Sequence, residues 1–268
     1  MPLQPRCLYP LPMTWNEDSG TVSRTFDDWK ASDRDNRAFL RLSTQWSSEA
    51  YQQTWHEAEK SFEERFDPDR HYGDEHVGMF HDAVDGLWPN DYAWITEASV
   101  VKSAVTAFEV YLEKALEEAV GRTFTKDGTT HTVKLATPPR FESPGWKTLV
   151  SAHKVLGTVV ETDDVAWARA LRHLLTHQNG ELRTEDALAR FRDADAERGQ
   201  DAIDRAYVGG KVRLGVPRVV KILDSLAAVI RTADAPVWAL CWSRPGRERW
   251  GDVMTALYQQ KCIVIESV

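Results

Sequence analysis

Apolar side chains recur every three or four residues in four stretches of the chain, which predicts four core helices. The longest runs from about Tyr92 to Val120, and Gly121 follows it as a natural C-terminal stop. The other three are predicted over Trp146–Leu156, from an N-cap at Thr162 to just before Gly180, and over Pro217–Thr232. One face of the longest helix is apolar, and it is formed by Val101, Ala104, Phe108, Tyr111 or Leu112, Ala115 and Ala119.

The segments between these helices carry other patterns. β-Branched runs flank a turn around Asp127-Gly128, which predicts a β-hairpin between the first two helices. Residues 184–206 are rich in both charge signs and predict a solvated helical face. Residues 209–217 predict a turn and a short strand-like stretch, and CIVIES near the end could form a strand.

The two ends of the chain lack a clean period. Residues 1–22 predict a loosely held arm, whereas residues 25–66 have aromatic residues at irregular, mostly helix-compatible spacings. We therefore expect an all-α protein: a helical bundle over residues 94–235 with a small β-hairpin insertion and irregular N- and C-terminal extensions. The extensions are residues 1–93, with a helical character, and residues 236–268.

The bulk composition is that of a globular protein that can bury a core. Of 268 residues, 42% are hydrophobic and 28% charged. The net charge of −8 disfavours broad binding to nucleic acid through phosphate neutralisation, but it leaves room for a local basic site. Cys7, Cys241 and Cys262 are far apart and form no CxxC pair, which favours a reducing compartment. No apolar run approaches a membrane span and the N-terminus lacks a secretory signal, so we expect a cytoplasmic protein with no membrane association.

Polar chemistry concentrates in RHLLTHQNG, residues 172–180, at the end of the third helix. His173 and His177 share one helical face, a spacing that zinc sites use, but Leu174 stands where HExxH has its glutamate and no third ligand has a persuasive spacing. We therefore expect no metal and no other cofactor. A purely structural role stays open, with the histidines interacting with the helix dipole and Arg172 pairing with Asp163, Asp164 or Glu181.

The same residues also suit RNA cleavage without a metal. His177 can move the proton of an attacking 2′-hydroxyl or protonate the leaving 5′-oxygen, and Arg172 can hold the phosphate. The products would be a 2′,3′-cyclic phosphate and a 5′-hydroxyl. Positions five apart on an ideal helix point about 140° apart. The helix must then end or deform by His177, or a second copy must complete the pocket.

The string ARALRHLLTHQNGEL resembles the signature of the HEPN (higher eukaryotes and prokaryotes nucleotide-binding) superfamily, an arginine, a polar residue, about three variable residues and a histidine. Arg172, His173 and His177 fit it in order. The helix containing AFEVYLEKAL, with Glu109, resembles the first HEPN helix, and GKVRLGVPRVVKIL resembles the lead into the last. The resemblance covers about residues 95–235.

The resemblance implies a homodimeric, metal-independent endoribonuclease of a toxin–antitoxin or anti-phage defence system. His177 would be the acid and base, Arg172 the phosphate clamp and His173 a supporting catalytic group, with Thr176, Asn179 and Glu109 in supporting positions. RNA would be the substrate, and an antitoxin or another defence protein a possible partner. Two alternatives remain open: a non-catalytic HEPN-like module that binds nucleotides or protein, and a scaffold.

Basic residues gather in two further places. The first group, a candidate RNA-binding surface, is Lys211, Arg213, Arg218 and Lys221. The second interleaves arginine with tryptophan: Arg244, Arg247 and Arg249 with Trp242 and Trp250. This pattern suits single-stranded nucleic acid, but a solvated face whose tryptophans cover the core is favoured. His71, His76 and His81 are five apart, so a solvated loop or short helix is favoured there over shared metal ligation.

Overall fold

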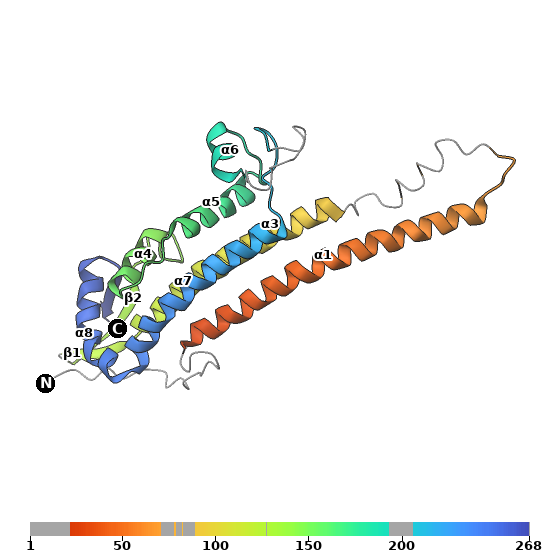
Figure 1. Cartoon of the computed structure of the whole chain (residues 1–268). Coiled ribbons are helices and arrows are strands. Elements are labelled where there is room, and N and C mark those ends of the chain that lie inside the picture. The colour runs from red at the N-terminus through yellow and green to blue at the C-terminus, as the bar shows by residue number, and fades with distance from the viewer. Residues whose placement is uncertain are drawn as a thin grey trace. The chain divides into compact units, whose positions relative to one another are not determined.

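Helices dominate the structure, a computed structural model that describes residues 22–70, 78, 82, 89–126, 128–192 and 206–267. Within that part of the chain, the helices are α1 (Arg24–Arg65), α3 (Pro89–Val120), α4 (Trp146–Val155), α5 (Asp163–His177), α6 (Glu185–Phe191), α7 (Val216–Trp242) and α8 (Arg244–Gln259) (Figure 1). The strands are β1 (Thr123–Lys126), β2 (Thr129–Leu135) and β3 (Ile263–Ser267). The expectation of a mostly helical protein with a β-hairpin is confirmed.

The described residues form two compact units. Of the described residues, those within 22–34, 104–170 and 222–267 belong to unit 1, and those within 35–103 and 171–221 belong to unit 2. Each unit combines segments that are distant in the sequence, so neither is a continuous stretch of chain. The candidate site around Arg172 to Gly180 belongs to unit 2, and the β-sheet belongs to unit 1.

The four periodic stretches form helices because their apolar stripes are buried, and α3, α4 and α5 lie close to their predicted bounds. Val101, Phe108, Leu112, Ala115 and Ala119 of α3 are all at most 1% exposed. The helix α5 begins after Thr162, whose hydroxyl accepts a hydrogen bond from the backbone N–H of Val165, as expected of an N-cap.

The helical character predicted for residues 25–66 is confirmed, but the helix is more regular than expected. Residues 24–65 form one continuous helix of 42 residues. Its buried positions include the polar residues Asn36 and Ser43, whereas Phe39 and Trp46 are 48% and 59% exposed. This mixture of polar residues inside and aromatic residues outside weakens the apolar period from which a helix is predicted.

Two carboxylates hold the N-terminus of α1 within unit 1. Asp234 of α7 accepts hydrogen bonds from the hydroxyl and the backbone N–H of Ser23, and Tyr111 of α3 donates to the same carboxylate at 3.1 Å. Glu118 accepts from the N–H and hydroxyl of Thr25 at 3.2 and 2.9 Å. The first N–H groups of a helix have no intrahelical partner, so these carboxylates satisfy them and face the positive end of the helix dipole. Burial raises the pKa of Asp234, although the hydrogen bonds from Ser23 oppose that shift.

The helix α7 continues beyond its predicted end. The predicted helix ends at Thr232, but α7 passes through Pro236 to Trp242. A proline inside a helix lacks one N–H donor and crowds the preceding turn. Within unit 1 the buried side chains of Ala233, Val237 and Leu240, the last at 5% exposure, offset that cost.

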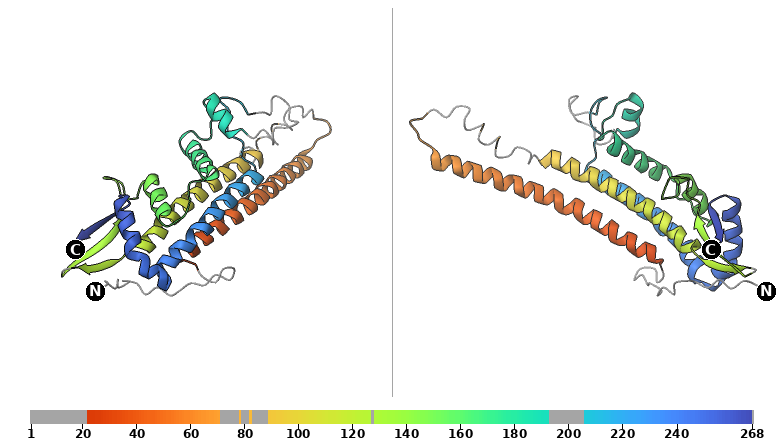
Figure 2. Two further views of the ribbon diagram at one scale, coloured as in Figure 1. Left: turned by 60° about the vertical axis from the view of Figure 1, so that its left-hand side comes forward. Right: turned by 180° about the vertical axis from the view of Figure 1, so that it is seen from behind.

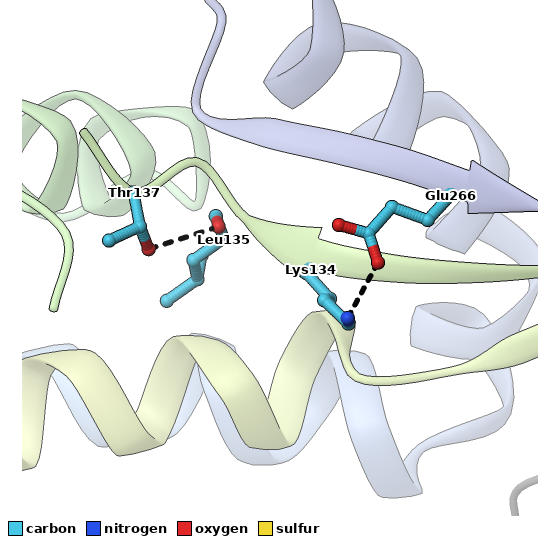
Figure 3. Close-up of polar contacts among 4 residues, drawn as sticks. All are labelled: Lys134, Leu135, Thr137 and Glu266. Carbon is cyan, nitrogen blue, oxygen red and sulfur yellow. Dashed lines mark hydrogen bonds and ion pairs between the residues drawn. The ribbon is translucent and has the colours of Figure 1, made fainter. Parts of the chain in front are cut away.

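The strands form one antiparallel sheet in the order β1-β2-β3. β3 adds to the predicted hairpin, with pairs from His131↔Ser267 to Leu135↔Ile263. Across this pairing, Lys134 Nζ lies 2.5 Å from a carboxylate oxygen of Glu266 (Figure 3). The last residues of the chain are thus joined to the hairpin, and α8 packs against β3 and α4 (Figure 2).

Candidate functional site

At the C-terminal end of α5 the apolar residues face inward and the polar residues face solvent. Leu171, Leu174 and Leu175 are at most 4% exposed, whereas His173, Thr176 and His177 are exposed and Arg172 is half-buried. The helix ends at His177, and Gly180 follows it with a positive φ of 76° that suits glycine; its N–H donates to the carbonyl oxygen of Leu174 at 3.2 Å. The predicted glycine stop is confirmed.

His173 and His177 form a pair on the surface of unit 2. They are one helical turn apart, and their ring centroids lie 4.5 Å from each other with an interplanar angle of 46°. Both side chains are exposed, so either ring can meet a ligand from solvent. The structure therefore presents two imidazoles together, with Thr176 on the turn between them.

Arg172 keeps its guanidinium available. Among the described residues it makes no ion pair, and two of the acids expected to pair with it have other partners: Asp164 accepts from the Ser225 hydroxyl at 3.0 Å, and Glu181 binds Arg183 at 3.0 Å. The helix is unbroken through His177. Arg172 and His177 therefore point about 140° apart and do not share a face within one chain.

The chain beyond α5 brings Lys211 to the end of this helix. Glu181 forms an isolated β-bridge with Lys211, and the N–H of Val212 donates to the carbonyl oxygen of Gly180 at 2.7 Å. The strand-like stretch predicted here is thus a single bridge. The ammonium group of Lys211 lies 4.4 Å from the ring centroid of Trp94. Asn179, with a positive φ of 50°, is exposed just before the bridge.

Trp94 and Glu97 hold the segment around Val212 and Gly215 in place. No local pattern in the sequence predicts either contact. The indole Nε1 of Trp94 donates to the carbonyl oxygen of Val212 at 2.8 Å. The carboxylate of Glu97, 7% exposed, accepts from the N–H of Gly215 at 2.8 Å. Burial raises the pKa of Glu97, and the Gly215 hydrogen bond partly opposes the shift. Both contacts join residues 118 positions apart.

The other members of the candidate RNA-binding group have different surroundings. Arg218 is half-buried, and its guanidinium donates to the carbonyl oxygens of Arg213 and Phe191 at 2.7 Å each. This arrangement gives Arg218 a role in holding α6 and the 206–215 segment to α7. Lys221 is exposed on α7 and Arg213 is half-buried. Within the group, Lys211 is the member that described contacts tie to the end of α5.

Glu109 belongs to a separate cluster in unit 1. Its carboxylate binds Arg169 Nε at 2.7 Å, and both side chains are about a quarter exposed. The guanidinium of Arg169 lies 3.6 Å from the ring centroid of Trp146, whose Nε1 donates to Glu161 at 2.6 Å. These contacts join α3, α4 and α5, and they give Glu109 a partner that sequence reasoning did not find.

The second arginine–tryptophan group is not a stacking surface at Trp250. That ring is 9% exposed, its Nε1 donates to the carbonyl oxygen of Ala119 at 3.2 Å, and Arg122 lies 5.1 Å from its centroid. Trp250 covers the core, which favours the structural alternative. His71, His76 and His81 lie outside the described residues.

Three further observations concern metal-binding clusters, membrane spans and similarity to known proteins. In the described ranges, no group of three or more His, Cys, Asp and Glu residues has a geometry that could hold a metal ion. None of the helices in the same ranges is long and apolar enough to cross a membrane. No family model, curated protein or solved structure matches the chain.

Proposed function

We propose that the chain is a HEPN-type endoribonuclease that cuts RNA without a metal ion. One observation carries the proposal: an exposed histidine pair stands at the end of α5, directly after an arginine that makes no ion pair among the described residues. Cleavage of a phosphodiester needs a side chain that accepts and donates protons and a cation that neutralises charge in the transition state. Arg172 and His177 supply those two groups.

The proposed reaction is an intramolecular transesterification. A histidine accepts the proton of the 2′-hydroxyl while the 2′-oxygen bonds to phosphorus, and the bond to the 5′-oxygen breaks as that oxygen receives a proton. The products are a 2′,3′-cyclic phosphate and a 5′-hydroxyl, with no net change in protons. His177 carries the proton, Arg172 holds the phosphate, and His173, Thr176 and Asn179 support His177.

A second copy of the chain belongs to the proposal. Because α5 is unbroken through His177, Arg172 and His177 diverge by about 140° and one copy does not aim both at the same phosphate. Two α5 ends related by a two-fold axis can place Arg172 of one copy opposite His177 of the other. Lys211 and Asn179 then flank the RNA. A role in toxin–antitoxin or anti-phage defence, in the cytoplasm and with a dedicated partner protein, rests on the family resemblance.

The direct test is cleavage of RNA in the presence of EDTA, followed by analysis of the ends. Wild type should give cyclic phosphate ends, and His177→Ala should lower the rate by about 10²–10⁴-fold, the range for a lost acid–base group. His56→Ala is a matched control, because His56 is also an exposed helical histidine on α1. A wild type that binds RNA but is as inert as His177→Ala would instead support the non-catalytic module.

A further inference from the structure

We propose that His173 and His177 form a two-imidazole binding site for a divalent late transition-metal ion, of the class of Cu²⁺, Ni²⁺ and Zn²⁺. Sequence reasoning set a metal aside because a third protein ligand is missing. The distance between the two rings nevertheless suits an exchangeable ion that takes its remaining ligands from water.

The separation of the rings matches chelation of one ion. A bonded ion lies about 2.0–2.1 Å from an imidazole nitrogen, and thus about 3.2 Å from the ring centroid. Two such rings at a nitrogen–metal–nitrogen angle of roughly 90° have centroids about 4.5 Å apart. The observed centroid distance is 4.5 Å. The separation of the two rings therefore suits chelation of one ion once a nitrogen of each ring faces it.

The surroundings also favour a cation. His177 is the last residue of α5, where the helix dipole places partial negative charge. Both rings are exposed, so an ion can enter and keep several bound waters. Imidazole is a ligand of Cu²⁺, Ni²⁺ and Zn²⁺ but a poor one for Mg²⁺ and Ca²⁺, which prefer oxygen. We expect affinity in the order Cu²⁺ above Ni²⁺ and no measurable binding of Mg²⁺ here.

The metal site is argued from this geometry alone, whereas its effect on RNA cleavage rests on the proposed function. An ion bonded to His177 occupies the nitrogen that would accept or donate the proton, so metal binding and RNA cleavage exclude each other. The ion would then act as an inhibitor of the same site. Cleavage would be fastest with a chelator and would fall as Ni²⁺ is added.

The test is calorimetric titration of Ni²⁺ into the full chain after treatment with EDTA. We expect one site that is lost or weakened more than about tenfold in His173→Ala and in His177→Ala, since even a change outside the ligand shell costs 10–100-fold. The double variant His177→Ala/Gln178→His is the matched control. It keeps the number of histidines but turns the second ring about 100° further around the helix, so it should also lose the site.

Two further controls locate the ion. His56→Ala should keep the site, because it leaves the pair intact. Paramagnetic Ni²⁺ or Cu²⁺ should broaden the imidazole signals of His173 and His177 in NMR spectra at substoichiometric metal. Unchanged affinity in both single variants, or broadening confined to other histidines, would overturn the inference.

The outcomes separate the two proposals. Loss of the Ni²⁺ site in the variants, with no RNA cleavage by wild type in EDTA, supports the metal site and rejects the ribonuclease. Cleavage in EDTA that needs His177, with no Ni²⁺ site at the pair, supports the ribonuclease and rejects the metal site.

Discussion

Gly180 and Trp94 approach so closely that a Cβ atom built on Gly180 would lie 2.6 Å from Cζ2 of the indole. The glycine ends α5 directly after the candidate site, and the same indole binds the carbonyl oxygen of Val212. The end of α5, the N-terminal part of α3 and the segment leading to α7 therefore meet at one ring within unit 2. A glycine is required there for two reasons, its positive φ of 76° and the lack of space.

We predict that Gly180→Ala destabilises the protein by about 2–4 kcal/mol, because left-handed strain and a clash with the indole add. Urea unfolding followed by fluorescence measures the change. Gly209→Ala is the matched control, because Gly209 has a φ of 93° but nothing lies within 4 Å of its built Cβ. This substitution should cost only the backbone strain, about 1–2 kcal/mol. Equal effects of the two substitutions would show that the Trp94 contact does not matter.

Mixing two inactive variants tests whether the site is shared between copies. Arg172→Ala and His177→Ala should each be inactive alone. If Arg172 of one copy serves His177 of the other, a mixed dimer keeps one intact site, and an equal mixture should recover about a quarter of wild-type cleavage. A site built within one copy predicts no recovery at any ratio. Cleavage in EDTA after exchange of subunits is the measurement.

His153 should make stability depend on pH. The side chain is fully buried in unit 1, with Nε2 3.1 Å from the carbonyl oxygen of Leu112, and burial lowers its pKa to about 4. The unfolded chain binds a proton near pH 6.5 and the folded chain does not. The contribution of His153 to the free energy of unfolding is therefore fully present above about pH 6.5. It falls by on the order of 3 kcal/mol as the pH drops toward 4.

Urea unfolding at a series of pH values measures this slope. His153→Gln can still donate to Leu112 but does not titrate, so it should flatten the slope between pH 6.5 and 4. His56→Gln, at an exposed position, should leave the slope as in wild type. A slope that His153→Gln does not change would place its origin in other groups.

Glu109 and Arg169 should be energetically coupled. Their ion pair is about a quarter exposed, and Arg169 also stacks on Trp146. A double-mutant cycle with Glu109→Gln and Arg169→Met should give a coupling energy of about 1 kcal/mol, measured by urea unfolding. The exposed pair Arg244–Glu248 on α8 is the reference, with a coupling of at most about 0.5 kcal/mol. If the two cycles agree, partial burial adds nothing to the Glu109–Arg169 pair.

Structural features that depend only on neighbouring residues were predicted well from the sequence. The Thr162 N-cap, the glycine after the end of α5 and the hairpin of β1 and β2 each depend on neighbouring residues, so the local pattern was enough to predict them. Features that join distant segments left no such pattern. β3 pairs with β2 across more than a hundred residues, and Trp94 meets Val212 at a separation of 118.

The candidate site was partly predictable for the same reason. His173 and His177 come together because they are one turn apart on one helix, a spacing visible in the sequence. The place of Lys211 beside Trp94 depends on the path of the chain after Gly180, which no local spacing fixes. For Trp250, the arginine-rich context allowed stacking, but the favoured interpretation was a tryptophan that covers the core, and its burial against α3 supports that interpretation.

The carboxylates that cap α1 also affect the order in which parts of the chain become stable during synthesis. α1 leaves the ribosome early, yet one of the groups that satisfy its first turn, Asp234, lies 211 residues after Ser23. Until α7 has emerged, the N-terminal turn of this helix has an incomplete cap and frays. The helix α1 is therefore fastened only after α7 has emerged, and the nascent chain carries it until then without this anchor.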